Sequence, residues 1–178
     1  MLTGIEIPRK NQVWCTDITY IRCQNGFMYL TAITDVYSRY IVAWGLSNSL
    51  NKELCTSVLK KALKRVKPEI INTDQGSQYM SNDFVDLVSK NKIQLSMDSK
   101  WRTRDNIRIE RFWRSIKYQE IFLNEYPNVT GLYLGIQKYI GFYNHHRGHQ
   151  SLEMNTPASV YFHSLIFYSK KVYVKKIA

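Results

Sequence analysis

Three acidic residues, Asp17, Asp74 and Glu110, lie in segments whose patterns predict strands and a helix. Asp17 stands inside the apolar and aromatic run "WCTDITY", where an unpaired buried charge would be costly. Asp74 ends the apolar run "EIINTD", and Glu110 lies inside the helix-like run "NIRIERFW". Two aspartates on adjacent strands and a glutamate on a helix packed across the strand ends can converge on one point. Such an all-oxygen set, without cysteine or clustered histidine, suits Mg²⁺ or Mn²⁺.

Each acid also has an ordinary explanation when it is taken alone. Asp17 can pair with a lysine or arginine, Asp74 can form a turn, and Glu110 can be a solvated helix residue. Fifty-six residues separate Asp17 from Asp74, and 35 separate Asp74 from Glu110. Two metal ions, typically ~3.5–4 Å apart, activate an attacking oxygen and stabilise the leaving oxygen in an in-line displacement at phosphorus. We therefore expect these three acids to be catalytic residues and ligands of two Mg²⁺ or Mn²⁺ ions.

The composition indicates a folded, strongly basic domain. The chain has 178 residues, of which 44% are hydrophobic, and 25 Lys and Arg against 14 Asp and Glu give a net charge of +11. Such a surplus favours a polyanionic partner, DNA first, although a basic protein without such a partner is the alternative. Three cysteines without CxxC spacing argue against structural zinc and disulfides and favour the cytoplasm. We expect neither a signal peptide nor a membrane span.

The helix that carries Glu110 belongs to a cationic stretch. Seven basic residues and two acids occur from Lys100 to Lys117, and Asn106, Glu110, Trp113 and Lys117 share one helical face. A solvated charged helix is the alternative, but beside a phosphate-cutting centre the stretch is expected to bind the DNA backbone. The residues expected to contact DNA are Lys117, Asn106, Arg108, Arg111, Arg114, Lys100, Arg102, Arg104 and Trp101.

The order of the predicted elements indicates an α/β fold. It is a ribonuclease H-like, five-stranded mixed sheet, with an antiparallel meander of three strands, two parallel strands and helices on both faces. Strands are predicted at 13–23, 27–38, 41–47, 69–74 and 93–97, and helices at 51–67, 82–90, 105–122 and 130–146. The expected organisation is a lead-in at 1–10, a catalytic core at 11–125, a helical extension at 126–163 and a basic tail at 164–178.

Five segments, in order, resemble the catalytic region of insertion-sequence transposases of the IS-three family, which have a retroviral-integrase-like core. They are "NQVWCTDITYI", "DVYSRYIVAW", "TDQGSQY", "DNIRIERFWRSIKYQEIF" and "YIGFYNHHRGHQSLEMNTPASVY". Together they span about residues 8–162. Several motifs in register are far more specific than a lone pattern. The resemblance implies a ribonuclease H-like fold and Mg²⁺-dependent strand cleavage and joining at the ends of a mobile element.

The resemblance also implies roles for individual residues. Asp17, Asp74 and Glu110 take the family's triad positions, Lys117 contacts the terminal DNA, and Asn106 belongs to the Asp-Asn pair before the glutamate. Asp35 and Arg39 match the "DxxSR" segment, in which we expect Asp35 to be structural. The "YNxxRxH" segment is expected to brace the core or to touch DNA. The residues expected to support the site are Asp35, Arg39, Gly76, Tyr143, Asn144, Arg147 and His149.

The chain departs from the family pattern before the glutamate helix. Ser99 and Trp101 stand where the family has glycines, so that this loop is either stiffened or offers Trp101 for stacking on a base. The family's helix-turn-helix reader of element ends is expected to be separately encoded or missing. The expected partners are element-end and target DNA and further copies of the chain, in a bacterial cytoplasm at the nucleoid.

Alternative functions remain open at this point. The chain could be a truncated, catalytically impaired DNA-binding remnant of a transposase. A third hypothesis is a ribonuclease H that acts on RNA–DNA hybrids. The spacing of 35 residues between Asp74 and Glu110 argues against it. Zinc binding by His145 and His149 is disfavoured, because Gly148 interrupts a helix there.

Overall fold

A five-stranded mixed sheet forms the centre of the fold. The computed structural model describes residues 6–23, 26–97 and 107–162. The strand order is β3-β2-β1-β4-β5, in which the first three strands are antiparallel neighbours and β4 and β5 continue parallel to β1. The strands are β1 (Val13–Cys23), β2 (Gly26–Asp35), β3 (Ile41–Ser47), β4 (Ile70–Thr73) and β5 (Gln94–Met97). The predicted mixed sheet is confirmed.

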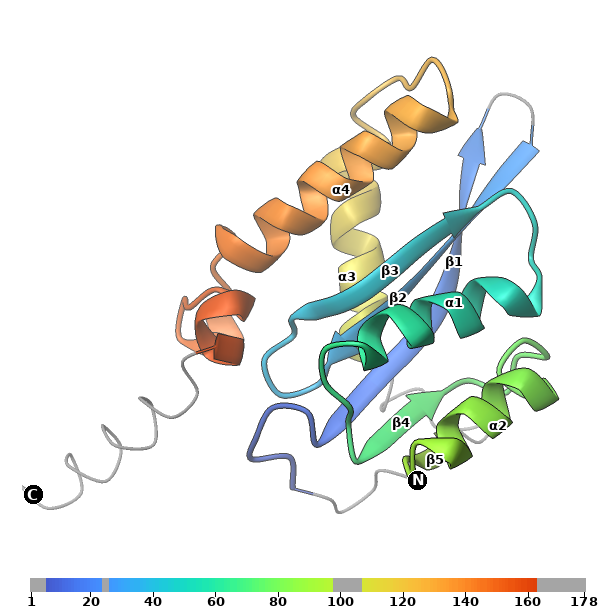
Figure 1. Ribbon diagram of the computed structural model, residues 1–178. Helices are drawn as coiled ribbons and strands as arrows, with labels where there is room; N and C mark the ends of the chain where they lie inside the picture. The colour runs from blue at the N-terminus through green and yellow to red at the C-terminus, as the bar shows by residue number, and fades with distance from the viewer. Residues whose placement is uncertain (1–5, 24–25, 98–106, 163–178) are drawn as a thin grey trace, which may run out of the picture.

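Helices cover both faces of the sheet, as predicted (Figure 1). Two of them, α1 and α2, pack on one face, and α3 and α4 pack on the other. No helix among the described residues has the length and apolar character needed to cross a bilayer. The helices are α1 (Lys52–Leu63), α2 (Asn82–Lys90), α3 (Ile107–Ile116) and α4 (Val129–His145), with a π-helical segment at Lys117–Ile121 and a short 3₁₀ turn at Gln150–Leu152.

Local hydrogen bonds set the ends of the elements. The Asn51 side chain accepts from the Leu54 amide at 3.2 Å and begins α1. At the other end, the amides of Arg65 and Val66 bond back to the Ala62 carbonyl, so α1 ends before the predicted residue 67. The second strand likewise ends at Asp35, because the next residues form a turn.

The central strand β1 sends alternate side chains to opposite faces. Trp14 belongs to the core under α1 and α2, whereas Ile21 belongs to the core under α3 and α4. Asp17 lies four residues before Ile21, so its side chain is on the same face of the sheet and points toward α3. This alternation places a carboxylate under a helix instead of in solvent.

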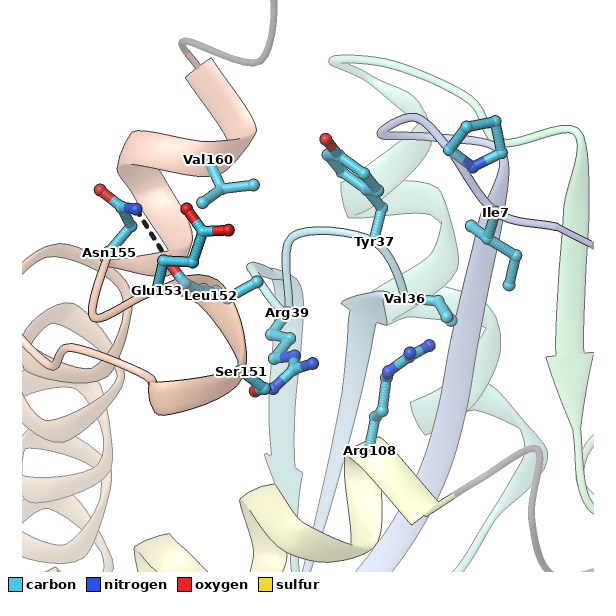
Figure 2. A pocket seen from close by; sticks show the side chains of 11 residues that line it. Ile7, Val36, Tyr37, Arg39, Arg108, Ser151, Leu152, Glu153, Asn155 and Val160 are labelled. Carbon is cyan, nitrogen blue, oxygen red and sulfur yellow. Dashed lines mark hydrogen bonds between the residues drawn. The ribbon is translucent and has the colours of Figure 1, made fainter. Parts of the chain in front are cut away.

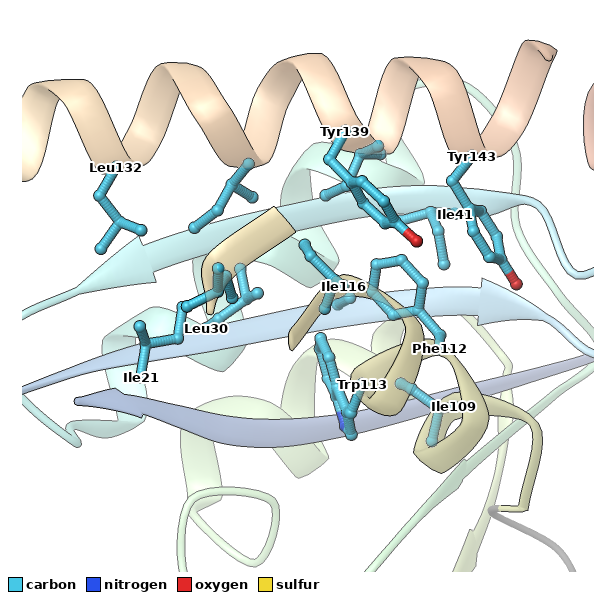
Figure 3. Close-up of a cluster of buried hydrophobic side chains, with 14 of the residues drawn as sticks. Ile21, Leu30, Ile41, Ile109, Phe112, Trp113, Ile116, Leu132, Tyr139 and Tyr143 are labelled. Atoms are coloured by element: carbon cyan, nitrogen blue, oxygen red, sulfur yellow. The ribbon is translucent and has the colours of Figure 1, made fainter. Parts of the chain in front are cut away.

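Four buried residues of α3 define its inward face: Ile109, Phe112, Trp113 and Ile116. Their spacing of three and four residues is that of one helical face. Figure 3 shows these side chains between α4 and the sheet, with Trp113 pointing from α3 toward β1. This packing fixes the rotation of α3 about its axis, and with it the direction of Glu110.

The predicted helix 105–122 differs in two respects. Its first two residues lie outside the described part of the chain, and after Ile116 the α-helix continues as a π-helix, in which the Phe122 amide bonds to the Lys117 carbonyl at 2.9 Å. The wider turn has a physical reason. Ile116 and Ile121 are both buried although they lie five residues apart, and a turn widened by i to i+5 hydrogen bonds brings such residues nearer to one face than an α-helical turn does.

Gly45 in β3 allows α1 to approach the sheet closely. A Cβ atom added at Gly45 would lie 2.6 Å from Val58 Cγ2 and 3.3 Å from Leu54 Cδ1. Valine is stiff about χ1, so Val58 cannot easily turn aside.

We expect Gly45→Ala to lower the free energy of unfolding by about 1–3 kcal/mol, because it overpacks this contact. Gly141→Ala in α4 is the matched control, since a Cβ there meets nothing within 4 Å and alanine favours the helix. Urea denaturation followed by circular dichroism measures both variants. Equal stabilities of the two variants would contradict the close approach.

Candidate active site

The two aspartates lie at the same end of the ladder between two neighbouring parallel strands. Cys15 of β1 is paired with Asn72 of β4. This is the last pair of the ladder, and Asp17 and Asp74 each follow it by two residues. Because adjacent strands lie about 4.8 Å apart, the register directs both residues to the same end of the β1–β4 ladder. The crossover through α1 delivers Asp74 to this end.

A side-chain hydrogen bond joins the glutamate helix to the first aspartate. Trp113 Nε1 donates to Asp17 Oδ2 at 2.9 Å, across 96 residues of sequence. Glu110 lies one turn before Trp113 on α3, so the bond that orients Trp113 also directs Glu110 toward β1. Sequence reasoning placed Trp113 on this face but gave it no role; its spacing of three residues from Glu110 was the available signal.

The electrostatics of Asp17 show that the three acids share one environment. Burial raises the pKa of Asp17, while hydrogen bonds from Trp113 and the Ile18 amide lower it. The negative charges of Asp74 and Glu110 raise this pKa further. Like charges at short range favour the protonated carboxyl. A divalent cation would remove this repulsion.

The acids nevertheless do not form a closed ligand set. Within residues 6–23, 26–97 and 107–162, no group of three His, Cys, Asp or Glu side chains could hold a metal ion as it stands. Asp74 and Glu110 are both exposed, and Asp74 Oδ1 accepts from the Gly76 amide at 3.0 Å. The site is therefore open, with one half-buried carboxylate, that of Asp17, and two exposed ones.

Gly76 keeps the turn after β4 tight. A Cβ at Gly76 would lie 2.9 Å from Asp74 Oδ1 and 3.2 Å from Gln78 Oε1. Any larger residue would push against the carboxylate that the turn positions.

Lys117 lies on the same flank of α3 as Glu110. Burial lowers the pKa of Lys117, and the charge of Asp17 opposes that shift. Lys117 is therefore within electrostatic range of Asp17, at the point where the α-helix becomes a π-helix. A partly buried ammonium here can meet a phosphate placed at the acids.

Asp35 is fully buried and serves as a hydrogen-bond acceptor for the turn that follows β2. Its Oδ2 accepts from the Asn11 amide at 2.7 Å, and its Oδ1 accepts from the amide and hydroxyl of Ser38 at 2.8 and 2.6 Å. Burial raises the pKa of Asp35, and these bonds oppose the shift. The geometry is that of a brace between the chain before β1 and the turn before Arg39.

The "YNxxRxH" residues pack at the end of α4. Asn144 accepts from the Ile41 amide at 2.9 Å and donates to the Ile41 carbonyl at 3.1 Å, which fastens α4 to β3. The Tyr143 ring contacts the His149 ring edge-on, with centroids 4.9 Å apart. The Arg147 guanidinium lies 5.8 Å from the centre of the Tyr143 ring.

Arg39 approaches this segment from the loop between β2 and β3. Its Nη1 donates to the hydroxyl of Ser151, and Figure 2 shows the two side chains in contact above Arg108 of α3. The cavity drawn there has a volume of about 420 Å³ and includes Glu153 in its wall. Arg108, Arg111 and Arg114 line a second cavity, which adjoins this one because both have Arg39, Arg108 and Ser151 in their walls.

Five of the expected DNA contacts lie outside the described residues. They are Lys100, Trp101, Arg102, Arg104 and Asn106. Ser99, which replaces a family glycine in the same loop, also lies there.

Comparisons with known proteins agree with this architecture. The family model of the integrase core domain matches residues 7–103, and a second integrase core domain model matches residues 91–157. The first match alone covers more than half of the chain. The chain belongs to the integrase core domain family. The predicted resemblance to the catalytic core of IS-three family transposases is confirmed.

Relatives of this integrase core include proteins of bacterial insertion elements and a transposase-like protein. This chain is 34% identical over 153 residues to a 31 kDa protein of insertion element IS600 from Shigella sonnei. The match covers 84% of this chain and 56% of that protein. This chain is 33% identical to a transposase-like protein of Haemophilus influenzae, covering 85% of this chain and 71% of that one. Against the transposase InsF of IS3A from Escherichia coli, identity is 35%, over 61% of this chain and 39% of the relative. This integrase core thus spans little more than half of the IS600 protein.

Solved structures share the fold of this integrase core. The HTLV-2 integrase catalytic core domain in complex with magnesium aligns with a TM-score of 0.71 and 20% identity, over 86% of this chain and 97% of that one. The catalytic core domain of BIV integrase aligns with a TM-score of 0.66 and 16% identity, over 89% and 99%. These likenesses confirm the predicted ribonuclease H-like fold.

We expect Asp17→Asn to stabilise this integrase core at pH 7 in EDTA. The raised pKa means that ionisation of Asp17 costs stability once the pH exceeds its ordinary value of 3.8, and asparagine removes that cost while it can still accept from Trp113. A gain of about 2–4 °C in melting temperature corresponds to about 1 kcal/mol for a chain of this size. The gain should shrink as the pH falls through the raised pKa of Asp17.

Asp35→Asn is the matched control for that measurement. It places an amide NH₂ against a donor on one side of the carboxyl site, so it should lower the free energy of unfolding by about 1–3 kcal/mol. Destabilisation by both variants at pH 7 would contradict the electrostatic description of Asp17.

Proposed function

We propose that this integrase core is the catalytic domain of a transposase that cleaves DNA phosphodiester bonds at the ends of a mobile element and joins the freed 3′ ends to target DNA. The observation that carries the proposal is the electrostatic meeting of Asp17 with Asp74 and Glu110, beside the helix fixed by Trp113. Family membership and insertion-element relatives support it.

The residues at this site fit a divalent oxygen-ligated cation. Three carboxylates and no cysteine or histidine make a hard donor set for Mg²⁺ or Mn²⁺, and the repulsion felt by Asp17 would favour a cation. Asp17, Asp74 and Glu110 are the residues that would hold the ions. Bound there, the ions supply charge neutralisation at phosphorus and activation of an oxygen nucleophile.

The chain's own residues position the reactants. Trp113 holds Oδ2 of Asp17 and so fixes the orientation of this carboxylate. Asp74 and Glu110, being exposed, can turn toward Asp17 by rotation of their side chains. Lys117 binds a phosphate beside the acids, and the arginines of α3 hold the backbone further along. Water and then a 3′-hydroxyl act as nucleophiles, so the enzyme forms no covalent bond to DNA.

The wider setting follows from the same proposal. Element-end DNA and target DNA are the substrates, and further copies of the chain assemble on paired ends. A helix-turn-helix reader of the ends is either separately encoded or missing. The setting is a bacterial cytoplasm. The catalytic unit comprises residues 11–125, and residues 126–163 form its helical extension.

Asp74→Asn and Glu110→Gln should each lower Mn²⁺-dependent nicking or strand transfer by at least about 10²-fold, because each removes a metal ligand and charge that preorganises the site. The assay uses purified chain and a labelled element-end duplex, with Mn²⁺ or EDTA. Asp86→Asn on the exposed side of α2 is the control and should leave the rate unchanged.

Three outcomes of that assay count against the proposal. Full activity of Asp74→Asn would show that Asp74 is not a catalytic metal ligand. Metal-independent DNA binding without any cleavage by the wild-type chain would mean a binding remnant. Faster cleavage of an RNA–DNA hybrid than of duplex DNA would mean a ribonuclease H.

Lys117→Gln should weaken DNA binding and reduce the slope of log K against log salt by about one unit, because one phosphate contact is lost. Fluorescence anisotropy between 50 and 200 mM salt, the range used for such slopes, provides the measurement. Lys138→Gln, on an exposed position of α4, removes the same charge and should leave the slope unchanged. Identical slopes for both variants would exclude Lys117 from the DNA interface.

A further inference from the structure

A second basic site lies on the opposite flank of α3 from the acids. A helix has 3.6 residues per turn, so Arg108 and Arg111 face away from the flank that carries Glu110 and Lys117. The arginines of that far flank line a cavity of about 350 Å³, here called the arginine pocket. Its walls are Arg39, Arg108, Arg111, Arg114, Ser115, Tyr143, Arg147, His149, Gln150 and Ser151.

The arginine pocket contains five guanidinium groups and no acidic side chain. The ion pairs formed among described residues do not involve any of the five. These charges act on one another, since burial and then the charges of Arg108 and Arg111 lower the pKa of Arg39. Burial together with Arg147 and Arg39 lowers the pKa of His149 to about 4. Uncompensated cations from three separate segments are costly unless an anion joins them.

Two nitrogen atoms at the inner wall lack acceptors. Arg39 Nε and His149 Nε2 are buried, and neither finds a hydrogen-bond partner in the described part of the chain. His149 is only 9% exposed and is held edge-on against Tyr143. Buried polar groups in folded proteins usually have a partner. An oxygen anion in the pocket would supply acceptors that the protein itself does not.

We propose that the arginine pocket binds one backbone phosphate of the DNA strand that crosses α3 from the acidic site. This inference rests on the proposed function. Guanidinium groups match the fork geometry of phosphate oxygens, which favours a phosphate over other anions. Arg114, on the exposed ridge between the two flanks, connects the sites. A helix with its side chains is about 10–12 Å across and DNA rises 3.4 Å per nucleotide, so the phosphate lies about three nucleotides from the cut.

The test uses the full chain carrying Asp17→Asn, which binds without cutting. Element-end duplexes in which one phosphate at a time is replaced by a neutral methylphosphonate are titrated by fluorescence anisotropy. The pocket variant is Arg111→Gln with Arg147→Gln. The matched control, Lys60→Gln with Lys64→Gln, removes the same charge from exposed positions around α1, on the other face of the sheet.

The pocket variant should bind the unmodified duplex about tenfold more weakly than the control. One methylphosphonate, about three nucleotides from the cut mapped with the active chain, should weaken the parent and the control about tenfold but the pocket variant less than twofold. Equal affinities of pocket variant and control, or an unchanged methylphosphonate profile in the pocket variant, would overturn the proposal. Arg111→Gln alone, at an exposed position, repeats the test if the double variant melts early.

Inorganic phosphate separates a DNA site from a free-anion site. Phosphate should shift the His149 ring signals in NMR spectra, and the duplex should displace it. Phosphate that stays bound when the duplex is saturating would overturn the assignment to DNA. The binding readouts do not require cleavage; only the numbering of the phosphate from the cut does. An inactive triad with an intact methylphosphonate effect would therefore count against the proposed function alone, and the reverse result against the pocket alone.

Discussion

The hydrogen bond from Trp113 to Asp17 is the contact on which the geometry of the site depends. It ties the middle of the central strand to a helix that the chain reaches only 96 residues later. Because the rotation of α3 is fixed by this bond and by its four buried residues, the directions of its exposed residues are also fixed. Glu110 and Lys117 turn toward the acidic site, and Arg111 turns toward the arginine pocket. One tertiary contact therefore orients two sites of opposite charge.

Both sites are assembled from groups that repel one another. Burial and two neighbouring acids raise the pKa of Asp17, and on the other flank Arg39 is destabilised by Arg108 and Arg111. Such arrangements lower the stability of the isolated protein and are characteristic of functional sites. In the proposed complex, divalent cations would offset the charges of the acidic site, and a DNA phosphate would offset those of the arginine pocket. The free protein is thus strained electrostatically in a way that its proposed substrate complex is not.

Much of the fold could be predicted because it depends on local patterns. Apolar and aromatic runs predicted the strands, and helical periods predicted the helices to within a few residues. The site depended on more distant relations. No local pattern shows that Trp113 donates to Asp17, that Arg39 meets a segment over one hundred residues away, or that Asp74 turns back on its own loop. The π-helix was missed because the segment is only five residues long and contains one buried residue, Ile121, from which no period can be read.

The parallel register between β1 and β4 determines where the chain can accept insertions and deletions. The pairing of Cys15 with Asn72 sets where Asp17 and Asp74 leave the β1–β4 ladder, whatever the number of residues between the two strands. Insertions or deletions in the connections on either side of α1 would leave the pair in place. A single residue added inside Ile70–Thr73 would instead send the second carboxylate to the opposite face of the sheet. Homologues should therefore vary in length within the crossover and keep four residues in this short strand.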